Sequence, residues 1–237
     1  MDNKKKSTSA SSLTVLLIVI CTISFIKPQK ADAQQMVVDD ATVLIDKQMQ
    51  FEAWYGTEES VVQPVLSLSH LWEFTPGAIF DTANEGDLQN LFGELKYIPT
   101  DLEFDGFSYG WTGALVFDTG GGVERYYTYI PFTKYVLNKT SKLHLNIGLK
   151  GADNATGDWE DRFTTGFRAD FDITNRFEVL SEVFAYNFDD VGFQAGLRVK
   201  IVPDLLDLDL TYGQGFEDGT DYPGFNVGIA FRPNRVW

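Results

Sequence analysis

Apolar and polar residues alternate along most of the chain after residue 47. In Lys142–Lys150, which reads KLHLNIGLK, every second residue is leucine or isoleucine. Successive side chains of a strand point to opposite faces, so this period of two predicts a strand with one apolar face. Similar runs, bounded by turn residues, predict about 12 strands in all, with 10 as the next count. The other runs are Met49–Gly56, Val62–Trp72, Ala78–Asp81, Leu91–Ile98, Ser108–Phe117, Glu124–Val136, Phe163–Ile173, Phe177–Tyr186, Val191–Ile201, Leu206–Gly213 and Phe225–Phe231.

The alternation fails in one of these runs. In Phe177–Tyr186, Leu180 and Phe184 have the same parity as Glu178 and Glu182, so apolar and acidic side chains would share a face. Turn residues border the run on both sides, and we therefore still expect a strand there.

The gaps between the strands suggest a barrel that crosses a membrane. Gaps alternate between a mostly short set and a set that includes the longest, which is how bacterial outer-membrane barrels place short periplasmic turns opposite long outer loops. Pro99–Phe107 belongs to the short set and is too long for it. The pattern predicts an all-β fold, an antiparallel up-and-down transmembrane β-barrel. The other short gaps are Glu73–Gly77, Leu137–Ser141, Thr174–Arg176 and Val202–Leu205, and the long ones are Thr82–Asn90, Gly151–Arg162 and Gln214–Gly224.

The polar face of the strands carries glycines and charges of both signs. In a membrane barrel the apolar face meets lipid and the polar face lines the lumen, whereas a soluble β-sandwich packs its apolar faces together. Opposite charges on neighbouring strands suit an enclosed polar lumen. The residues that we expect to line it are His144, Arg168, Asp170, Asp172, Glu182, Gln194, Arg198, Lys200, Asp207 and Asp209.

The strand register of one hairpin can be predicted from its charges. If Val202–Leu205 forms the turn, Ile201 faces Leu206, Lys200 faces Asp207 and Arg198 faces Asp209. Opposite charges that face each other across two strands stabilise a register by about 0.2–1 kcal/mol per pair.

Residues 1–33 have the order of a secretory signal peptide. Three lysines at positions 4–6 precede an apolar run from Leu13 to Ile26, and Ala31-Asp32-Ala33 fits a cleavage site. Residues 34–46 would then be a lead-in, and 47–237 a single barrel domain. No later stretch is long and apolar enough for a spanning helix. Export of a barrel predicts the outer membrane of a Gram-negative-type cell, with its lipids and the barrel-insertion machinery as partners.

The chain is acidic, with 19 basic and 34 acidic residues. Residues 1–33 hold five of the lysines and two of the aspartates, which leaves 14 basic and 32 acidic residues and a net charge of −18. Nucleic acid is therefore not expected as a partner, because binding it needs a basic surface. The one cysteine, Cys21, lies in the signal. The acidic loops at 153–161 and 217–221 lack the spacing of an EF-hand calcium site.

No motif for catalysis, a cofactor or a metal is present. The two histidines, His70 and His144, do not form an H-E-x-x-H or Cys/His pattern. Ser69 and His70 are adjacent on an expected strand, so their side chains would point to opposite faces. We expect no enzyme, no cofactor and no metal. A barrel lipid hydrolase stays as an alternative that would require a nucleophile and base in mutual reach.

Part of the chain resembles a known family of outer-membrane barrels. Residues 196–198, 202–204 and 208–213 resemble the C-terminal hairpin of the family named for the meta-pathway of phenol degradation, and residues 143–148 and 176–183 are also similar. The resemblance covers about residues 140–216. It implies a transporter-like barrel and brings no catalytic motif.

These observations favour a passive channel or transporter for small solutes. Two alternatives stay open: a non-conducting structural or adhesive barrel, and a secreted soluble β-sandwich that binds a ligand. A barrel of about 12 strands lies between small filled barrels and wide porins, so the strand count does not choose between an open and a filled lumen.

Overall fold

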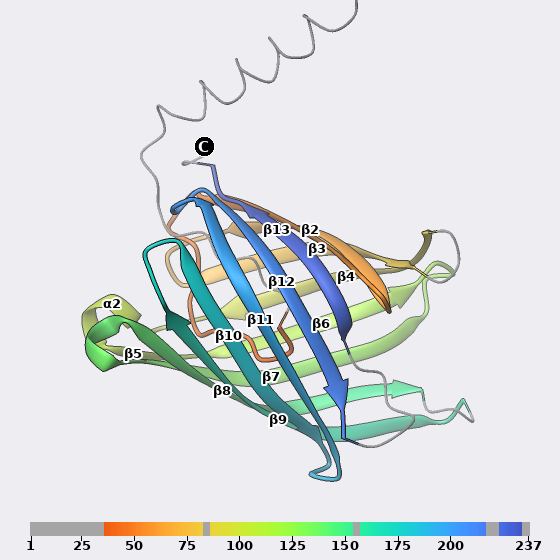
Figure 1. Cartoon of the computed structure of the whole chain (residues 1–237). Helices are drawn as coiled ribbons and strands as arrows, with labels where there is room; N and C mark the ends of the chain where they lie inside the picture. Colours follow the sequence, from red (N-terminus) through yellow and green to blue (C-terminus); the bar gives the residue numbers. More distant parts are fainter. Residues whose placement is uncertain (1–35, 83–85, 154–156, 217–222, 234–237) are drawn as a thin grey trace, which may run out of the picture.

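Thirteen strands follow one another along the described residues, which are 36–82, 86–153, 157–216 and 223–233 of the computed structural model shown in Figure 1. A short helix, α2 (Leu102–Asp105), and a 3-10 turn, η1 (Leu137–Lys139), lie between strands. The strands are β1 (Met49–Gly56), β2 (Glu59–Ser67), β3 (Trp72–Asp81), β4 (Asp87–Tyr97), β5 (Phe107–Tyr109), β6 (Trp111–Asp118), β7 (Val123–Val136), β8 (Ser141–Asp153), β9 (Trp159–Asp172), β10 (Phe177–Tyr186), β11 (Asp190–Val202), β12 (Leu206–Gly215) and β13 (Gly224–Phe231).

The strands close into a ring of 12. Apart from β5, each strand pairs antiparallel with the next strand in the sequence, and β1 pairs with β13 to close the ring. β5 and β6 together occupy one position in the wall, because β5 pairs with the C-terminal half of β7 and β6 pairs with its N-terminal half. Gly110 separates them, and a Cβ at this position would lie 2.0 Å from the carbonyl oxygen of Tyr97. The predicted antiparallel transmembrane-type barrel of about 12 strands is confirmed.

Each of the 12 predicted runs corresponds to one strand position, but several boundaries differ and one turn was misplaced. The predicted long gaps Thr82–Asn90 and Gly151–Arg162 are shorter than expected, because β4 begins at Asp87, β8 runs to Asp153 and β9 begins at Trp159.

The first of the short turns was predicted at Glu73–Gly77, but it lies at residues 68–71. β2 therefore ends at Ser67, and Glu73–Gly77 belongs to β3. The ladder of the two strands is interrupted between the pairs Val62–Ala78 and Leu66–Phe74, and Pro64 and Pro76 lie in this interruption. Neither proline has an N–H to donate, which interrupts the ladder at this point. The dipeptide Pro76-Gly77 is typical of a turn, although here it lies within a strand.

The gap at Pro99–Phe107, too long for a simple turn, contains α2. Asp101 caps this helix by accepting hydrogen bonds from the backbone N–H groups of Glu103 and Phe104, and Gly106 ends it with a φ of 75°. A left-handed φ favours glycine at the end of a helix.

The structure confirms two of the three contacts predicted for the β11–β12 hairpin. Arg198 faces Asp209 and Lys200 faces Asp207. Ile201 does not face Leu206, because the register shifts between Lys200 and Val202 and places Val202 opposite Leu206. A bulge of this kind inserts one extra residue into one strand.

The wall is polar inside and apolar outside. Among the described residues, 26 buried side chains are polar or charged and 16 are apolar. On β8, His144 and Asn146 are buried while Leu145 and Ile147 are exposed. Exposed leucine, isoleucine and phenylalanine side chains cover the outer face of most strands. This polarity is the one that a barrel in lipid requires.

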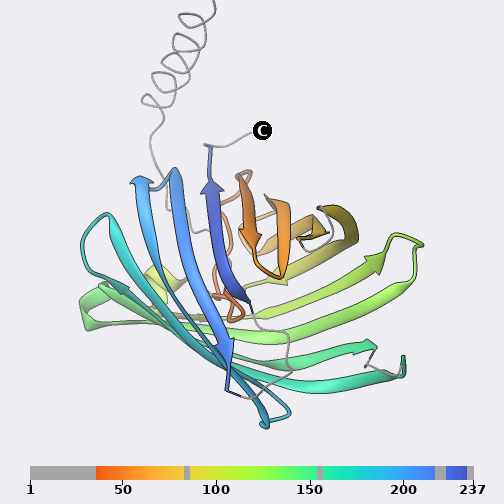
Figure 2. The same ribbon diagram turned by 45° about the vertical axis from the view of Figure 1, so that its right-hand side comes forward.

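Residues 36–46, which we call the inner segment, run through the barrel rather than along its wall. Figure 2 shows this coil enclosed by the strands. Met36, Val38, Ala41 and Leu44 are buried in it. The segment leads to β1 at the end of the barrel where β13 finishes. We call this the proximal end, and the end with the β1–β2 turn the distal end.

The expected signal peptide at 1–33, the start of the expected lead-in and the terminal Trp237 lie outside the described residues. Within the described ranges, no helix combines the length and apolar character needed to cross a bilayer.

Candidate functional site in the barrel lumen

Eight of the ten residues expected to line the lumen are buried in the barrel. Asp172 and Lys200 lie near the proximal end and are partly exposed, with 34% and 21% of their side-chain surfaces accessible. The buried eight are His144, Arg168, Asp170, Glu182, Gln194, Arg198, Asp207 and Asp209.

The first group of these residues forms a chain of hydrogen bonds across β7, β8 and β9. The Arg168 guanidinium donates to both Asp170 carboxylate oxygens, over 2.9 and 3.0 Å. His144 Nε2 lies 3.1 Å from Asp170 Oδ2, and His144 Nδ1 lies 2.8 Å from Thr133 Oγ1. A carboxylate accepts only, so Nε2–H donates to Asp170, and in the neutral imidazole Nδ1 then accepts from the Thr133 hydroxyl.

This series of hydrogen bonds ends on the inner segment. Arg168 Nη1 donates to the Val38 carbonyl oxygen over 2.6 Å, and the Ala41 backbone N–H donates to Thr133 Oγ1 over 2.7 Å. Hydroxyl, imidazole and carboxylate stand in the order of a nucleophile, a base and an orienting acid. However, Thr133, His144 and Asp170 are fully buried, and Thr133 is bound to the inner segment. The group therefore positions the segment rather than a substrate.

A second charge network lies on β9, β10, β11 and β12. Arg198 Nε and Nη2 each donate to one oxygen of Asp209, over 2.9 and 2.8 Å, which is a bidentate pair. Glu178 lies 3.7 Å from Arg198 and 3.6 Å from the Lys200 ammonium. The Lys200 ammonium also donates to Asp172, at the end of β9, over 2.7 Å. The network therefore cross-links four strands from within the lumen.

Glu178 was not among the predicted lumen residues, although its strand gave a signal. Glu178, Leu180, Glu182 and Phe184 are all buried, so the irregular parity in β10 is real. The inner segment explains it, because a Cβ on Gly166 would touch both Val38 and Phe184. This part of the inner wall therefore packs against Val38.

Carboxylates of the wall hold the backbone of the inner segment. The two oxygens of Glu182 accept from the N–H groups of Val37 and Val38, both over 2.9 Å. Glu73 accepts from the Leu44 N–H over 2.7 Å. The Ser108 hydroxyl donates to the Ala41 carbonyl oxygen. These groups come from β10, β3 and β5, so the segment is bound across the full width of the lumen.

Asp39 is the charged anchor of the inner segment. Its carboxylate lies 2.8 Å from the Lys96 ammonium, and the Tyr129 hydroxyl donates to it over 2.9 Å. The Asn146 amide satisfies the Asp39 backbone, with its oxygen 2.7 Å from the N–H and its nitrogen 3.0 Å from the carbonyl oxygen. Both Asp39 and Lys96 are buried, so each charge depends mainly on its protein partners for compensation.

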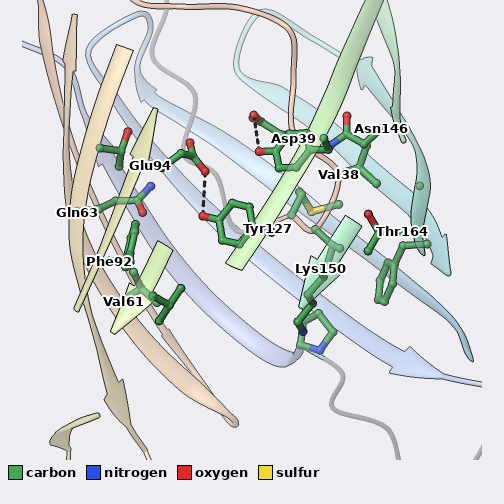
Figure 3. Close-up of a pocket in the computed structure, with 18 of the residues that line it drawn as sticks. Val38, Asp39, Val61, Gln63, Phe92, Glu94, Tyr127, Asn146, Lys150 and Thr164 are labelled. Carbon is green, nitrogen blue, oxygen red and sulfur yellow. Dashed lines mark hydrogen bonds between the residues drawn. The ribbon is translucent and has the colours of Figure 1, made fainter. Parts of the chain in front are cut away.

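A cavity of about 440 Å³ lies in the lumen beside the inner segment. Met36–Asp39 line it, and so do Glu58 in the β1–β2 turn and Pro223 before β13. It therefore extends from the inner segment toward the distal end. Figure 3 shows the Tyr127 hydroxyl donating to Glu94 in this cavity, over 2.9 Å.

The cavity lining contains a set of acidic groups and an apolar cluster, and both come mainly from β1–β4. Val61, Ile79 and Val116 pack together, with Trp54, Phe92 and Tyr127 against them. The carboxyl groups of the lining are those of Asp39, Glu52, Glu58, Glu59, Glu73 and Glu94, and its cationic groups are those of Lys96, Arg125 and Lys150.

Sequence reasoning missed most of this cavity. Of the ten predicted lumen residues, all lie in β8–β12, where alternation is clean except in β10. The cavity is lined largely by β1–β4, β6 and β7, whose patterns are noisier. Glu94 and Lys96, two residues apart on an expected strand, were the available signal for an inner face there.

Comparisons with known proteins agree with the fold. The model of a family described as Uncharacterised conserved protein UCP029691 matches residues 20–232. A search of curated proteins by sequence gives no match. The KdgM porin in complex with disordered oligogalacturonate is 9% identical with a TM-score of 0.59, and the NanC porin is 13% identical with a TM-score of 0.53. Each match covers 78% of this chain and 98% of the porin. These likenesses show the fold of an outer-membrane porin.

Proposed function

The chain belongs to the family described as Uncharacterised conserved protein UCP029691, and we propose that it is an outer-membrane channel for small solutes. One observation carries this proposal: a closed 12-strand wall with an apolar exterior encloses a charged lumen that holds a cavity of about 440 Å³. Lipid suits the exterior, and water with dissolved solutes suits the interior. The similar porins support the same assignment. Export by the expected signal peptide would deliver the barrel to the outer membrane.

The inner segment would act as the gate of this channel. It lies between the cavity and the proximal end, where Ala41 and Leu44 are held by Ser108, Thr133 and Glu73. A solute that enters the distal cavity meets this segment before it reaches the other end. Conduction therefore requires the segment to move, and the state described here is the closed one.

The second candidate is a non-conducting barrel, and the same segment is the observation that favours it. Its backbone is hydrogen-bonded to strands on opposite sides of the lumen, such as β3 and β10. A permanent filling of this kind would stabilise the wall without passing a solute. Membership of the meta-pathway family is a finer proposal, supported by the residues of the β11–β12 hairpin. No catalytic role is proposed, since the hydroxyl–imidazole–carboxylate group is occupied by the inner segment.

The ligand in the KdgM structure is not transferred to this chain. Oligogalacturonate is a chain of acidic sugars. The cavity described here has six carboxyl groups against three cationic groups, so it would repel a polyanion.

A disulfide latch tests the channel and its gate together. A Cβ on Gly166 would lie 2.4 Å from Val38 Cγ2, so cysteines at the two positions in the variant Val38→Cys/Gly166→Cys would be neighbours, and a disulfide between them would fix the inner segment to β9. We expect conductance in planar bilayers from the reduced protein and its loss on oxidation. Leu145→Cys/Phe167→Cys, which links β8 to β9 on the outer face, is the matched control and should conduct in both states.

The outcomes separate the two candidates. A correctly inserted barrel that never conducts, reduced or oxidised, would replace the channel with the filled barrel. Equal conductance in both redox states would keep the channel and remove the gate. Conductance that oxidation of the control pair also abolishes would mean that cross-linking β8 to β9, not fixing the segment, blocks the pore.

A further inference from the structure

The cavity on the distal side of the inner segment has the features of a binding site for an organic cation. We propose that it takes a small molecule with an ammonium or amidinium group and an apolar body. The proposal rests on the proposed function, because it names the class of solute that the lumen selects. Its volume of about 440 Å³ lies within the roughly 300–1,000 Å³ of small-molecule sites.

The first argument is the excess of carboxyl groups in the lining. Asp39 is paired with Lys96 at 2.8 Å, and Glu59 lies 3.7 Å from Arg125. Each pair neutralises one cationic group of the lining. The other charged groups are four carboxyl groups, which come from β1, β3, β4 and the β1–β2 turn, and the Lys150 ammonium.

Glu52 and Glu94 belong to this remainder. Glu52 accepts hydrogen bonds from the side-chain amides of Gln50 and Gln63, and Glu94 accepts from the Tyr127 hydroxyl. All three donors are neutral, so they orient the carboxylates without neutralising them. Carboxylates that share a site repel one another, and a bound cation relieves that repulsion.

The second argument is the aromatic lining, which is independent of the charge count. Trp54, Phe92 and Tyr127 pack against the apolar cluster of Val61, Ile79 and Val116 and line the cavity with it. An ammonium over an aromatic face is attracted by the negative charge of the ring face. The chain already provides such a contact here, because the Lys150 ammonium lies 5.2 Å from the centre of the Tyr186 ring and both residues line the cavity.

The two kinds of lining group together define the ligand class. The carboxylates of Glu52 and Glu94 would bind the cationic end, and the neighbouring aromatic and aliphatic side chains would bind the apolar body. A neutral molecule would use only the apolar cluster. An inorganic cation would use only the carboxylates, and an anion would be repelled by them.

Three molecules of nearly equal size and shape test this selectivity: phenethylammonium, phenethyl alcohol and phenylacetate. Binding is measured by isothermal titration calorimetry on the full barrel in a maltoside detergent, which carries no charge. We expect phenethylammonium to bind roughly ten- to hundredfold more tightly than the alcohol, which is the effect of one contact to a charged group. Phenylacetate should bind most weakly.

Isosteric variants locate the site. Glu52→Gln and Glu94→Gln keep the shape of each side chain and remove its charge, and each should weaken phenethylammonium binding roughly tenfold. Glu103→Gln is the matched control, because Glu103 lies on α2 at the proximal end, outside the cavity lining, and should leave the affinity unchanged.

Each other result overturns the proposal. Equal affinity for the ammonium and the alcohol would make the site merely apolar. Full competition by sodium, with no preference for phenethylammonium, would make it an inorganic cation site. Unchanged affinity in both glutamine variants would place binding elsewhere. The measurement does not depend on conduction, so a barrel that conducts without binding contradicts only this inference, and one that binds without conducting contradicts only the channel.

Discussion

The buried pair of Asp39 and Lys96 should decide whether the inner segment stays in the lumen. Lys96 comes from β4 in the wall and Asp39 from the segment, and their charged atoms lie 2.8 Å apart. Only 7% and 4% of the two side-chain surfaces are accessible. Removing one partner of a buried pair leaves a charge without compensation and costs about 3–5 kcal/mol.

The surroundings make the two single substitutions unequal. Lys96→Met would leave Asp39 beside Glu73 and Glu94 with no lysine between them, so we expect close to the full cost. Asp39→Asn would leave Lys96 near these same carboxyl groups, so its cost should be smaller. The double variant removes both charges, and it should recover much of the stability that Lys96→Met loses.

Release of the segment can be measured by the reactivity of one cysteine. Leu44→Cys places a thiol at a buried position, where a water-soluble maleimide reaches it only after the segment leaves the wall. A loss of about 3–5 kcal/mol would raise the labelling rate by roughly two to three and a half orders of magnitude. Leu68→Cys, in an exposed turn, monitors the reagent. Unchanged protection of residue 44 in Lys96→Met would refute the reasoning.

Two further predictions concern the wall. Arg198→Lys should lower the stability of the barrel by about 1–3 kcal/mol in denaturant unfolding from liposomes, because lysine cannot make the two parallel hydrogen bonds that Arg198 makes to Asp209; no change would mean that the pair contributes nothing. Ile147→Arg should destabilise the same barrel by about 2–4 kcal/mol if residue 147 meets the middle of the bilayer. Lys150→Arg, a substitution on the inner face, should change stability far less, and equal losses would argue against a lipid-facing residue 147.

The regular part of the wall could be predicted from the sequence because period two is a local signal. The facing of Arg198 and Asp209 followed from a turn placed at Val202–Leu205 and from the alternating charges on its two sides. Irregular local chemistry set the limit. Turn residues Leu68–Leu71 contain no glycine or proline, and Pro76 lies inside β3. The bulge next to Lys200 also left no trace in the sequence pattern.

The inner segment and the cavity could not be predicted in this way. Val38 is bound by Glu182, which is 144 residues away in the sequence, and by Arg168, 130 residues away. These contacts use the backbone of the segment, so its side chains carry no matching pattern. Only the mixed parity of β10 hinted that something apolar lies inside the barrel.

The account depends on which face of the wall meets lipid, and a spin-label scan of residues 143–149 on β8 measures this directly. In liposomes, labels at Leu143, Leu145, Ile147 and Leu149 should be accessible to oxygen, which concentrates in the bilayer, and labels at His144 and Asn146 should not. Accessibility to oxygen without a period of two, or a protein that stays in solution without lipid or detergent, would contradict a barrel whose apolar face is its exterior.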